Sequence, residues 1–285
     1  MRLGLGPTNE MAQECPTRHS VQPDSLLWFW GNVYSQRGQD GILREIFCRL
    51  GIRCGMFVEF GAWDGMYLSN CRFLFEKGWH GVFIEADPDR FRVLTARYAK
   101  DHGIVCLNET VSAEKPLNKL LRNHTQHTTT DFVSIDIDGL DLDVALASHL
   151  PQIGAKVVLI EGGFNFDPHL EKRIPTEVAA ENIGQPIAVM VREMGQIGYE
   201  PVCFFQDVYF VRRELVEKFP ALRRDPVSLY QDAFNFMGDE HKTSLIEFRS
   251  KIGAEDFERP IRFLETIPES VVTGGGGKGA GSSGR

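Results

Sequence analysis

Short apolar runs alternate with longer amphipathic stretches through the middle of this chain, and that alternation limits its possible folds more than any other feature of the sequence. A repeated order of strand and helix predicts a mostly parallel sheet with helices packed on both faces. We therefore expect an α/β protein with a Rossmann-like, doubly wound sheet. The predicted strands are residues 56–60, 81–85, 104–107, 132–136 and 157–161.

The stretches between these runs carry apolar residues at helical spacing, which is typical of helices that cover a sheet. Pro88 suits the first turn of its helix, where a missing N–H is no loss. Two later apolar runs, 201–205 and 208–211, are expected to pair as antiparallel strands that close the sheet. The predicted helices are residues 38–50, 68–77, 88–100, 116–122, 142–149 and 186–197.

The two ends of the chain differ in composition from its middle. Residues 1–24 contain no sustained apolar run and are expected to form a flexible arm, while 273–285 is a Gly/Ser-rich tract that cannot bury apolar surface. Between them we expect one domain at 25–215, with 216–272 as a helical extension of the same domain.

The charge and the cysteine pattern limit the cellular setting. A net charge of −8 disfavours broad binding to nucleic acid or to an anionic membrane, because both would repel the chain at long range. No apolar run reaches the roughly 18 residues of a membrane span, and the first residues lack the apolar core of a signal peptide. The six cysteines are scattered, as expected for reduced thiols. We expect a cytoplasmic protein without nucleic-acid or membrane partners.

A glycine-containing turn follows the first predicted strand, where doubly wound sheets bind nucleotide-like ligands. A dinucleotide fingerprint requires glycine at its first, third and sixth positions, and this chain has Gly61, Trp63 and Met66 there. Tryptophan and methionine would crowd a pyrophosphate, which weakens the interpretation as an NAD-dependent oxidoreductase. S-adenosylmethionine (SAM) carries no phosphate and is compatible with this turn.

Glu85 lies at the tip of the second predicted strand. A carboxylate in this position can accept hydrogen bonds from both hydroxyls of a ribose. The alternative is that Glu85 caps the helix that begins near Pro88. Asn108, at the end of the third strand, could contact an adenine edge or cap its turn. The glycine turn and Glu85 together favour the ligand-binding interpretation.

Further carboxylates follow the fourth and fifth predicted strands. Alternation along an extended chain puts Asp136 and Asp138 on one side, where they would repel each other unless a cation, a basic group or a proton lay between them. With Glu161 they could hold a divalent metal such as Mg²⁺. Solvated acids that cap helices are the alternative. His169, in the next loop, could act as a general base or be an ordinary surface residue.

These features occur in an order that resembles the FkbM-like group of class I SAM-dependent methyltransferases, over roughly residues 34–215. The resemblance implies a seven-stranded Rossmann-like sheet with a reversed final strand, SAM at the tips of the first two strands, and O-methylation of a small molecule such as a sugar or natural product. Gly162 and Gly163 depart from the family, in which an asparagine often follows the fifth-strand glutamate. The matching segments are 35–41, 58–65, 68–70, 84–87, 134–139, 157–161 and 209–215.

The resemblance also implies roles for individual residues. It puts Asp136 beside the methionine end of SAM, with Gln36 and Gln39 closing over the ligand. A SAM-binding module without catalysis is an alternative function, and a homo-oligomer is also compatible with the sequence. The expected cofactor contacts are Gln36, Gln39, Glu59, Gly61, Ala62, Asp64, Glu85, Ala86, Asn108 and Asp136, and the expected catalytic residues are Asp136, Asp138 and His169.

Overall fold

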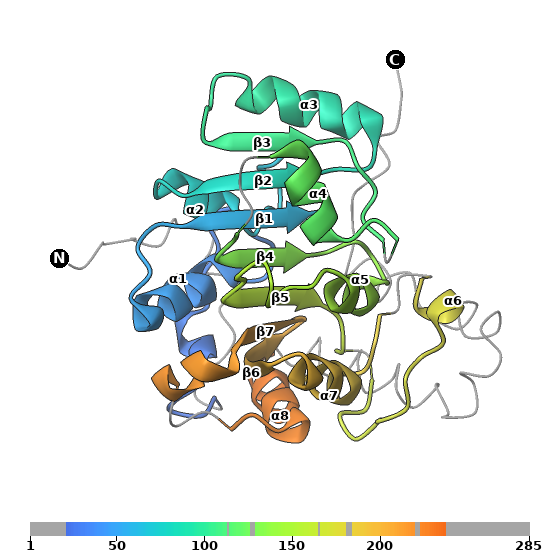
Figure 1. Cartoon of the computed structure of the whole chain (residues 1–285). Helices are drawn as coiled ribbons and strands as arrows, with labels where there is room; N and C mark the ends of the chain where they lie inside the picture. Colours follow the sequence, from blue (N-terminus) through green and yellow to red (C-terminus); the bar gives the residue numbers. More distant parts are fainter. Residues whose placement is uncertain are drawn as a thin grey trace, which may run out of the picture.

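The computed structural model describes residues 21–112, 114–125, 129–164, 166–180, 184–219 and 223–237. The strands in this part of the chain are β1 (Met56–Phe60), β2 (His80–Ile84), β3 (Ile104–Leu107), β4 (Phe132–Ile135), β5 (Val157–Glu161), β6 (Tyr199–Phe205) and β7 (Asp207–Arg212). They form one seven-stranded sheet in the order β3-β2-β1-β4-β5-β7-β6 (Figure 1). β1 to β5 pair in parallel, whereas β7 runs antiparallel to both of its neighbours. The predicted Rossmann-like sheet is confirmed.

The predicted strand limits hold for β1, β3 and β5 and shift slightly elsewhere. β2 ends at Ile84 and β4 at Ile135, so Glu85 and Asp136 follow their strands instead of ending them. The expected antiparallel pair is present, although both of its strands are longer than predicted.

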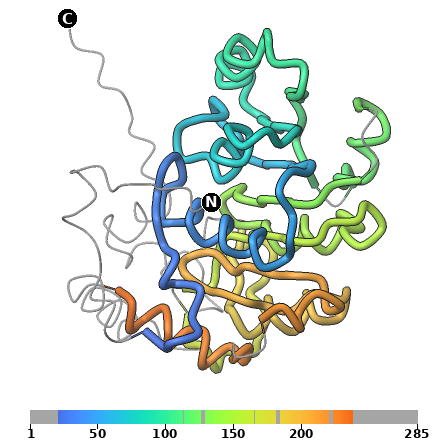
Figure 2. The backbone as a smooth tube through the Cα atoms, turned by 90° about the vertical axis from the view of Figure 1, so that its left-hand side faces the viewer, coloured from blue at the N-terminus to red at the C-terminus, as the bar shows by residue number. Residues whose placement is uncertain are grey.

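Helices cover both faces of the sheet, as expected. α2 lies on one face, and α4, α5 and α7 lie on the other (Figures 1 and 2). The predicted helix at 68–77 is shorter in the structure, because Leu68 has a φ of +57°, a left-handed conformation that a helix cannot include. The helical elements are η3 (Leu26–Phe29), α1 (Gln39–Leu50), α2 (Arg72–Glu76), α3 (Pro88–Tyr98), α4 (Leu117–His124), α5 (Asp141–Ala147), α6 (Thr176–Ala179), α7 (Ile187–Gln196), η4 (Arg213–Lys218) and α8 (Pro226–Phe236).

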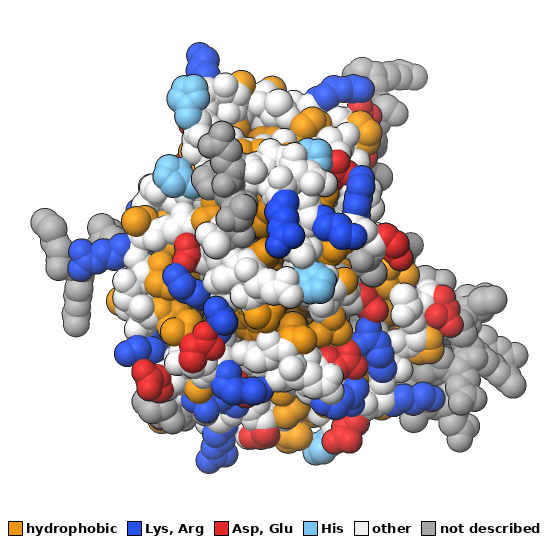
Figure 3. Space-filling model, viewed as in Figure 1, with side chains coloured by type: hydrophobic (Ala, Val, Ile, Leu, Met, Phe, Trp, Pro, Cys, Tyr) orange, Lys and Arg blue, Asp and Glu red, His pale blue; other side chains and the backbone are white. Residues whose placement is uncertain are grey.

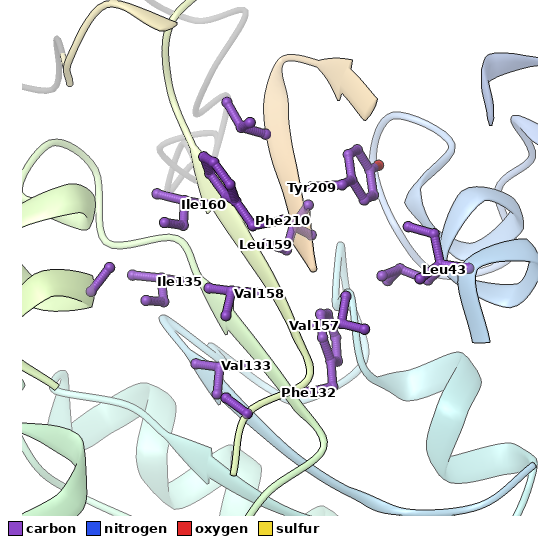
Figure 4. Close-up of a cluster of buried hydrophobic side chains, with 14 of the residues drawn as sticks. Leu43, Phe132, Val133, Ile135, Val157, Val158, Leu159, Ile160, Tyr209 and Phe210 are labelled. Atoms are coloured by element: carbon purple, nitrogen blue, oxygen red, sulfur yellow. The ribbon is translucent and has the colours of Figure 1, made fainter. Parts of the chain in front are cut away.

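The core lies on both sides of the central strands (Figure 4). β4 is buried at all four positions, and three of its four residues are apolar; the fourth, Ser134, is a buried polar residue. Phe132 packs edge-on against Phe47 of α1, with ring centroids 5.7 Å apart. Val133 and Ile135 alternate with it and are buried on the opposite face. Each such side chain contributes roughly 1.5–3 kcal/mol by leaving water.

α8 is the last described helix, and it packs against β6. Asp225 caps its first turn by accepting the Ser228 N–H at 2.8 Å, and Pro226 occupies that turn. At the other end of the chain, the Gln22 N–H donates to Asp232 of α8 at 2.9 Å. Most of the expected arm (1–20), the later part of the expected extension (238–272) and the expected tail (273–285) lie outside the described residues.

The exposed surface mixes both signs of charge. Lys and Arg side chains are interspersed with Asp and Glu on the face drawn in Figure 3. Among the described residues, no helix combines the length and apolar character that crossing a membrane would require.

Candidate functional site

Acidic side chains gather at one edge of the sheet, where the parallel strands end. Glu59 belongs to β1, Asp136 follows β4, and Glu161 ends β5. Asp207 joins them from the start of β7, because β7 runs in the opposite direction and its first residue pairs with Glu161. The reversal of one strand therefore brings a residue from a strand's beginning to the edge where the other strands end.

The glycine turn after β1 has a shape that depends on Gly61. Gly61 has a φ of +64°, and a Cβ atom there would lie only 2.0 Å from the carbonyl oxygen of Asp136. The next residue, Ala62, is buried and donates its N–H to the Ile84 carbonyl at 3.1 Å. Trp63 has a φ of +50°, which costs a non-glycine residue about 1–2 kcal/mol. This turn is strained and joined tightly to the tips of β2 and β4.

α3 holds the outer side of the same turn. The Arg97 guanidinium donates to the Asp64 carbonyl at 2.9 Å and to the Asp64 carboxylate at 2.7 Å. The other carboxylate oxygen of Asp64 accepts the N–H groups of Met66 and Tyr67. Asp64, an expected cofactor contact, thus has an evident structural role in fixing the turn.

Glu85 connects the tip of β2 to the glycine turn. It is 5% exposed, and its two carboxylate oxygens accept the N–H of Trp63 at 2.7 Å and the N–H of Asp87 at 2.8 Å. The side chain that caps α3 is Asp87, which accepts the N–H groups of Asp89 and Arg90. The alternative interpretation of Glu85 as the cap of this helix is therefore wrong.

Asn108, which was expected to contact an adenine edge or to cap its turn, lies beside Glu85. Its side-chain amide donates to the carbonyl oxygens of Glu85 at 2.8 Å and Ala86 at 3.1 Å. It thereby ties the end of β3 to the end of β2. The structure brings Glu85, Ala86 and Asn108 together with the glycine turn.

Glu59 is a buried carboxyl group behind this turn. Its oxygens accept the Ser69 hydroxyl at 2.6 Å and the Asn70 N–H at 2.7 Å. Burial raises the pKa of Glu59 to about 7, and the nearby charge of Asp136 adds to the rise, while the two hydrogen bonds oppose it. Both oxygens are occupied, so Glu59 holds the turn that contains Ser69 and Asn70.

A loop before α1 reaches the acidic edge from the other side. One oxygen of Asp40 accepts three backbone N–H groups, those of Val33, Tyr34 and Ser35, at 2.7–2.9 Å. Gln39 donates from Nε2 to the Asp207 carboxylate at 2.7 Å. The structure thus places Gln39 at the acidic edge.

Gln36 and Arg37 belong to the same loop. The carbonyl of the half-buried Gln36 accepts the side-chain amide of Asn32 at 2.9 Å. Burial raises the pKa of Asp207 to about 7 and the charge of Asp136 adds to this, whereas Gln39 and the positive charge of Arg37 act in the opposite direction. The loop therefore supplies both an amide and a cation near Asp207.

Asp136, Asp138 and Glu161 form an acidic cluster, with one carboxylate oxygen from each within 4.8 Å of the others. Their proximity was predicted, but the expected reason, alternation along a strand, is wrong. β4 has already ended, and Asp138 has a φ of +61° in a turn that Asp141 stabilises by accepting the N–H groups of Ile137 and Gly139. Burial, followed by the charges of neighbouring acids, raises the pKa of Glu161.

His169 lies on the exposed loop after β5. Its ring Nδ1 is 2.9 Å from an Asp167 carboxylate oxygen, and 73% of its side chain is exposed. It is not a member of the acidic cluster found among the described residues. Its role as a general base stays a prediction.

Sequence reasoning missed four polar residues that build this site. Ser69 and Asn70 were seen only as part of a matching segment, although they bind Glu59. Asp141 has a local signal, since an aspartate soon after a strand end often binds backbone N–H groups in a turn. No local sequence pattern predicts the position of Asp207, because that position depends on β7, a strand far along the chain that runs antiparallel to β5.

No protein-family model matches the sequence, and a comparison with curated proteins finds no match. Solved structures with a similar fold include a TehB-like SAM-dependent methyltransferase from Corynebacterium glutamicum, at 10% identity over 64% of this chain and 90% of that chain, with a TM-score of 0.39. A SAM-dependent methyltransferase from Aquifex aeolicus has 13% identity over 67% and 94% of the two chains, with a TM-score of 0.38.

A third similar structure is a SAM-dependent methyltransferase from Geobacter sulfurreducens in complex with S-adenosyl-L-homocysteine. It has 11% identity over 60% of this chain and 68% of that chain, with a TM-score of 0.37. The strand order and the antiparallel β7 are decisive for the fold. This chain has a seven-stranded Rossmann-like fold with a reversed last strand, as the resemblance to class I methyltransferases implies.

Proposed function

We propose that this chain is a SAM-dependent methyltransferase. The observation that carries the proposal is the junction of Glu85 with the glycine turn, through the 2.7 Å hydrogen bond from the Trp63 N–H. Each oxygen of a carboxylate can accept more than one hydrogen bond, so Glu85 can hold this turn and also accept ribose hydroxyls. Gly61 would contact the adenosine, and Ala86 and Asn108 would lie beside its adenine ring.

The charge of the neighbouring edge supports the same ligand. SAM carries a positive sulfonium, and the acidic cluster follows the strands next to the glycine turn. Opposite charges at short range stabilise each other more strongly away from bulk water than in it. Asp136 would lie beside the methionine end of SAM, and Gln36 and Gln39 would close over it.

In the proposed reaction, an acceptor hydroxyl oxygen attacks the methyl carbon in line with the carbon–sulfur bond. The new carbon–oxygen bond forms as the carbon–sulfur bond breaks, which leaves S-adenosylhomocysteine and transfers the acceptor's proton to a base. Alignment of the two reactants can supply much of the rate. Asp138, Asp136 or His169 would take the proton, and a small hydroxylated molecule such as a sugar would be the acceptor in an FkbM-like enzyme.

The acidic cluster also has the chemistry of a hard-cation site. Three carboxylate oxygens match the ligand preference of Mg²⁺, and Asp136, Asp138 and Glu161 would hold it. Bound there, the ion would polarise an acceptor oxygen. The test measures the rate of methyl transfer after chelation of metal ions and again after Mg²⁺ is added. Equal rates would show that the reaction does not need the metal.

Calorimetric titrations with SAM, S-adenosylhomocysteine and NAD side by side test the cofactor. We expect the two adenosylated sulfur compounds to bind and NAD not to bind, because Trp63 and Met66 crowd the place of a pyrophosphate. Binding of NAD alone would overturn the proposal and favour an oxidoreductase.

An Asp138→Ala variant tests catalysis separately from binding. We expect methyl transfer to fall at least about tenfold with SAM affinity unchanged, since Asp138 is the exposed carboxylate of the cluster and would face the acceptor, and a positioned base contributes roughly 10²–10⁴-fold. The measurement is the rate of S-adenosylhomocysteine formation with a small-molecule cell extract. Unchanged turnover would remove Asp138 from the mechanism, and no turnover in the unmodified protein would favour a SAM-binding module without catalysis.

A further inference from the structure

The last described helix meets the loop that follows Glu161. The hydroxyl of Tyr230, in α8, donates to the backbone carbonyl of Phe164 at 2.9 Å. The two rings stack as well, with centroids 5.2 Å apart and an interplanar angle of 30°. Phe164 also stacks on Phe204 of β6, at 5.3 Å and 29°. Phe204 and Tyr230 also contact each other, with centroids 5.7 Å apart, so Phe164 belongs to a cluster of three rings and accepts one hydrogen bond, three residues after Glu161.

The segment between Glu161 and Phe164 contains only two glycines. Gly162 and Gly163 have φ values of +136° and +88°, conformations that glycine enters and leaves more easily than other residues do. The Gly162 N–H donates to the Gln206 carbonyl at 3.1 Å, and Gly163 forms an isolated bridge with Pro186. Because glycines have no side chain to pack, the path of this loop depends on these two backbone contacts and on where Phe164 is fixed.

We infer that Tyr230 is a positioning residue for the loop on the acceptor side of the site. α8 fixes Phe164 by stacking and by the hydroxyl bond, and Phe164 in turn fixes the glycine segment beside Glu161. α8 thus belongs to the functional unit, although it lies beyond the segment that resembles known methyltransferases. The effect on turnover rests on the proposed function, whereas the effect on the loop does not.

Tyr230→Phe tests this inference, because it removes the hydroxyl and keeps the ring. Tyr199→Phe is the matched control: Tyr199 is also buried, and its hydroxyl donates to the Ala155 carbonyl at 2.6 Å, at the amino end of β5. Each variant loses one hydrogen bond from a hydroxyl to a backbone carbonyl. Such a bond contributes about 1 kcal/mol, so its loss would raise the equilibrium constant for local opening roughly fivefold. The first readout is hydrogen exchange of the amides at 162–164.

We expect exchange at these amides to speed up about fivefold in Tyr230→Phe and to stay unchanged in Tyr199→Phe. Equal exchange in the two variants would overturn the inference. The second readout is a pair of measurements on each variant. Turnover is measured at saturating SAM with cell extract as the acceptor source, and SAM affinity is measured separately. Lower turnover with unchanged affinity in Tyr230→Phe alone supports the inference, and an equal loss in both variants contradicts it. If the unmodified protein shows no turnover, the proposed function fails, while the exchange measurement still decides the role of Tyr230.

Discussion

Replacing Glu85 by alanine is expected to weaken SAM binding by about 100-fold or more. A hydrogen bond to a charged group contributes roughly 1.5–3 kcal/mol, so the loss of two ribose contacts would reach this size. The replacement would also leave the N–H groups of Trp63 and Asp87 without their present acceptor. Calorimetry with SAM and with S-adenosylhomocysteine measures the effect, and both ligands should be affected alike because they share the ribose.

Asp131→Ala is a matched control for this variant. Asp131 accepts the Met56 N–H at 3.0 Å and pairs with Lys156, but it precedes β4 and lies at the opposite edge of the sheet. We expect it to lower the melting temperature and to leave SAM affinity unchanged. Unchanged affinity in Glu85→Ala, or an equal loss in both variants, would contradict the proposed ribose contact.

The ligand-free protein is expected to lose stability as the pH rises from 5 to 8. Burial raises the pKa of Glu59 from its ordinary 4.5 to about 7 in the folded protein. The folded state therefore holds a proton that the unfolded state has released, and the stability this contributes is present below pH 4.5 and is lost as the pH rises through 7. At 1.36 kcal/mol per pKa unit, the shift from 4.5 to about 7 corresponds to a full loss of about 3 kcal/mol from Glu59. Asp207 has a shift in the same direction and adds to the trend.

Chemical unfolding of the ligand-free protein at a series of pH values measures this trend. Glu59→Gln should reduce the slope, because the amide keeps the shape of the side chain and has no proton to release in this range. Asp131→Asn again serves as the control and should leave the slope as it is. The same slope in Glu59→Gln and in the unmodified protein would contradict the assignment of this trend to Glu59.

The sheet was largely predictable from the sequence because its strands are buried on both faces. A strand such as β5 then appears as a continuous apolar run at residues 157–160 that ends at Glu161, and its limits are visible without any knowledge of its neighbours. The predicted helix at 68–77 began too early, because the left-handed conformation of Leu68 depends on contacts that a periodic pattern does not contain.

The site was predictable where it depends on strand tips and less so where it depends on turns and distant segments. Glu85 and Asn108 come together because their strands are neighbours and end at the same edge. Asp136 and Asp138 gather through a turn that Asp141 stabilises, which strand alternation did not anticipate. Asp207 reaches the edge only because β7 returns antiparallel, a property of the whole sheet.

The short connection between β6 and β7 has a consequence for how this protein could diversify. A single residue, Gln206, with a φ of +62°, joins the two strands at the edge that carries Glu161. Extra residues inserted at this hairpin would project from the edge that carries Glu161, while every strand pairing below it stayed intact. Under the proposed function, lengthening this connection is therefore a route to new acceptor preferences that would leave the glycine turn and Glu85 untouched.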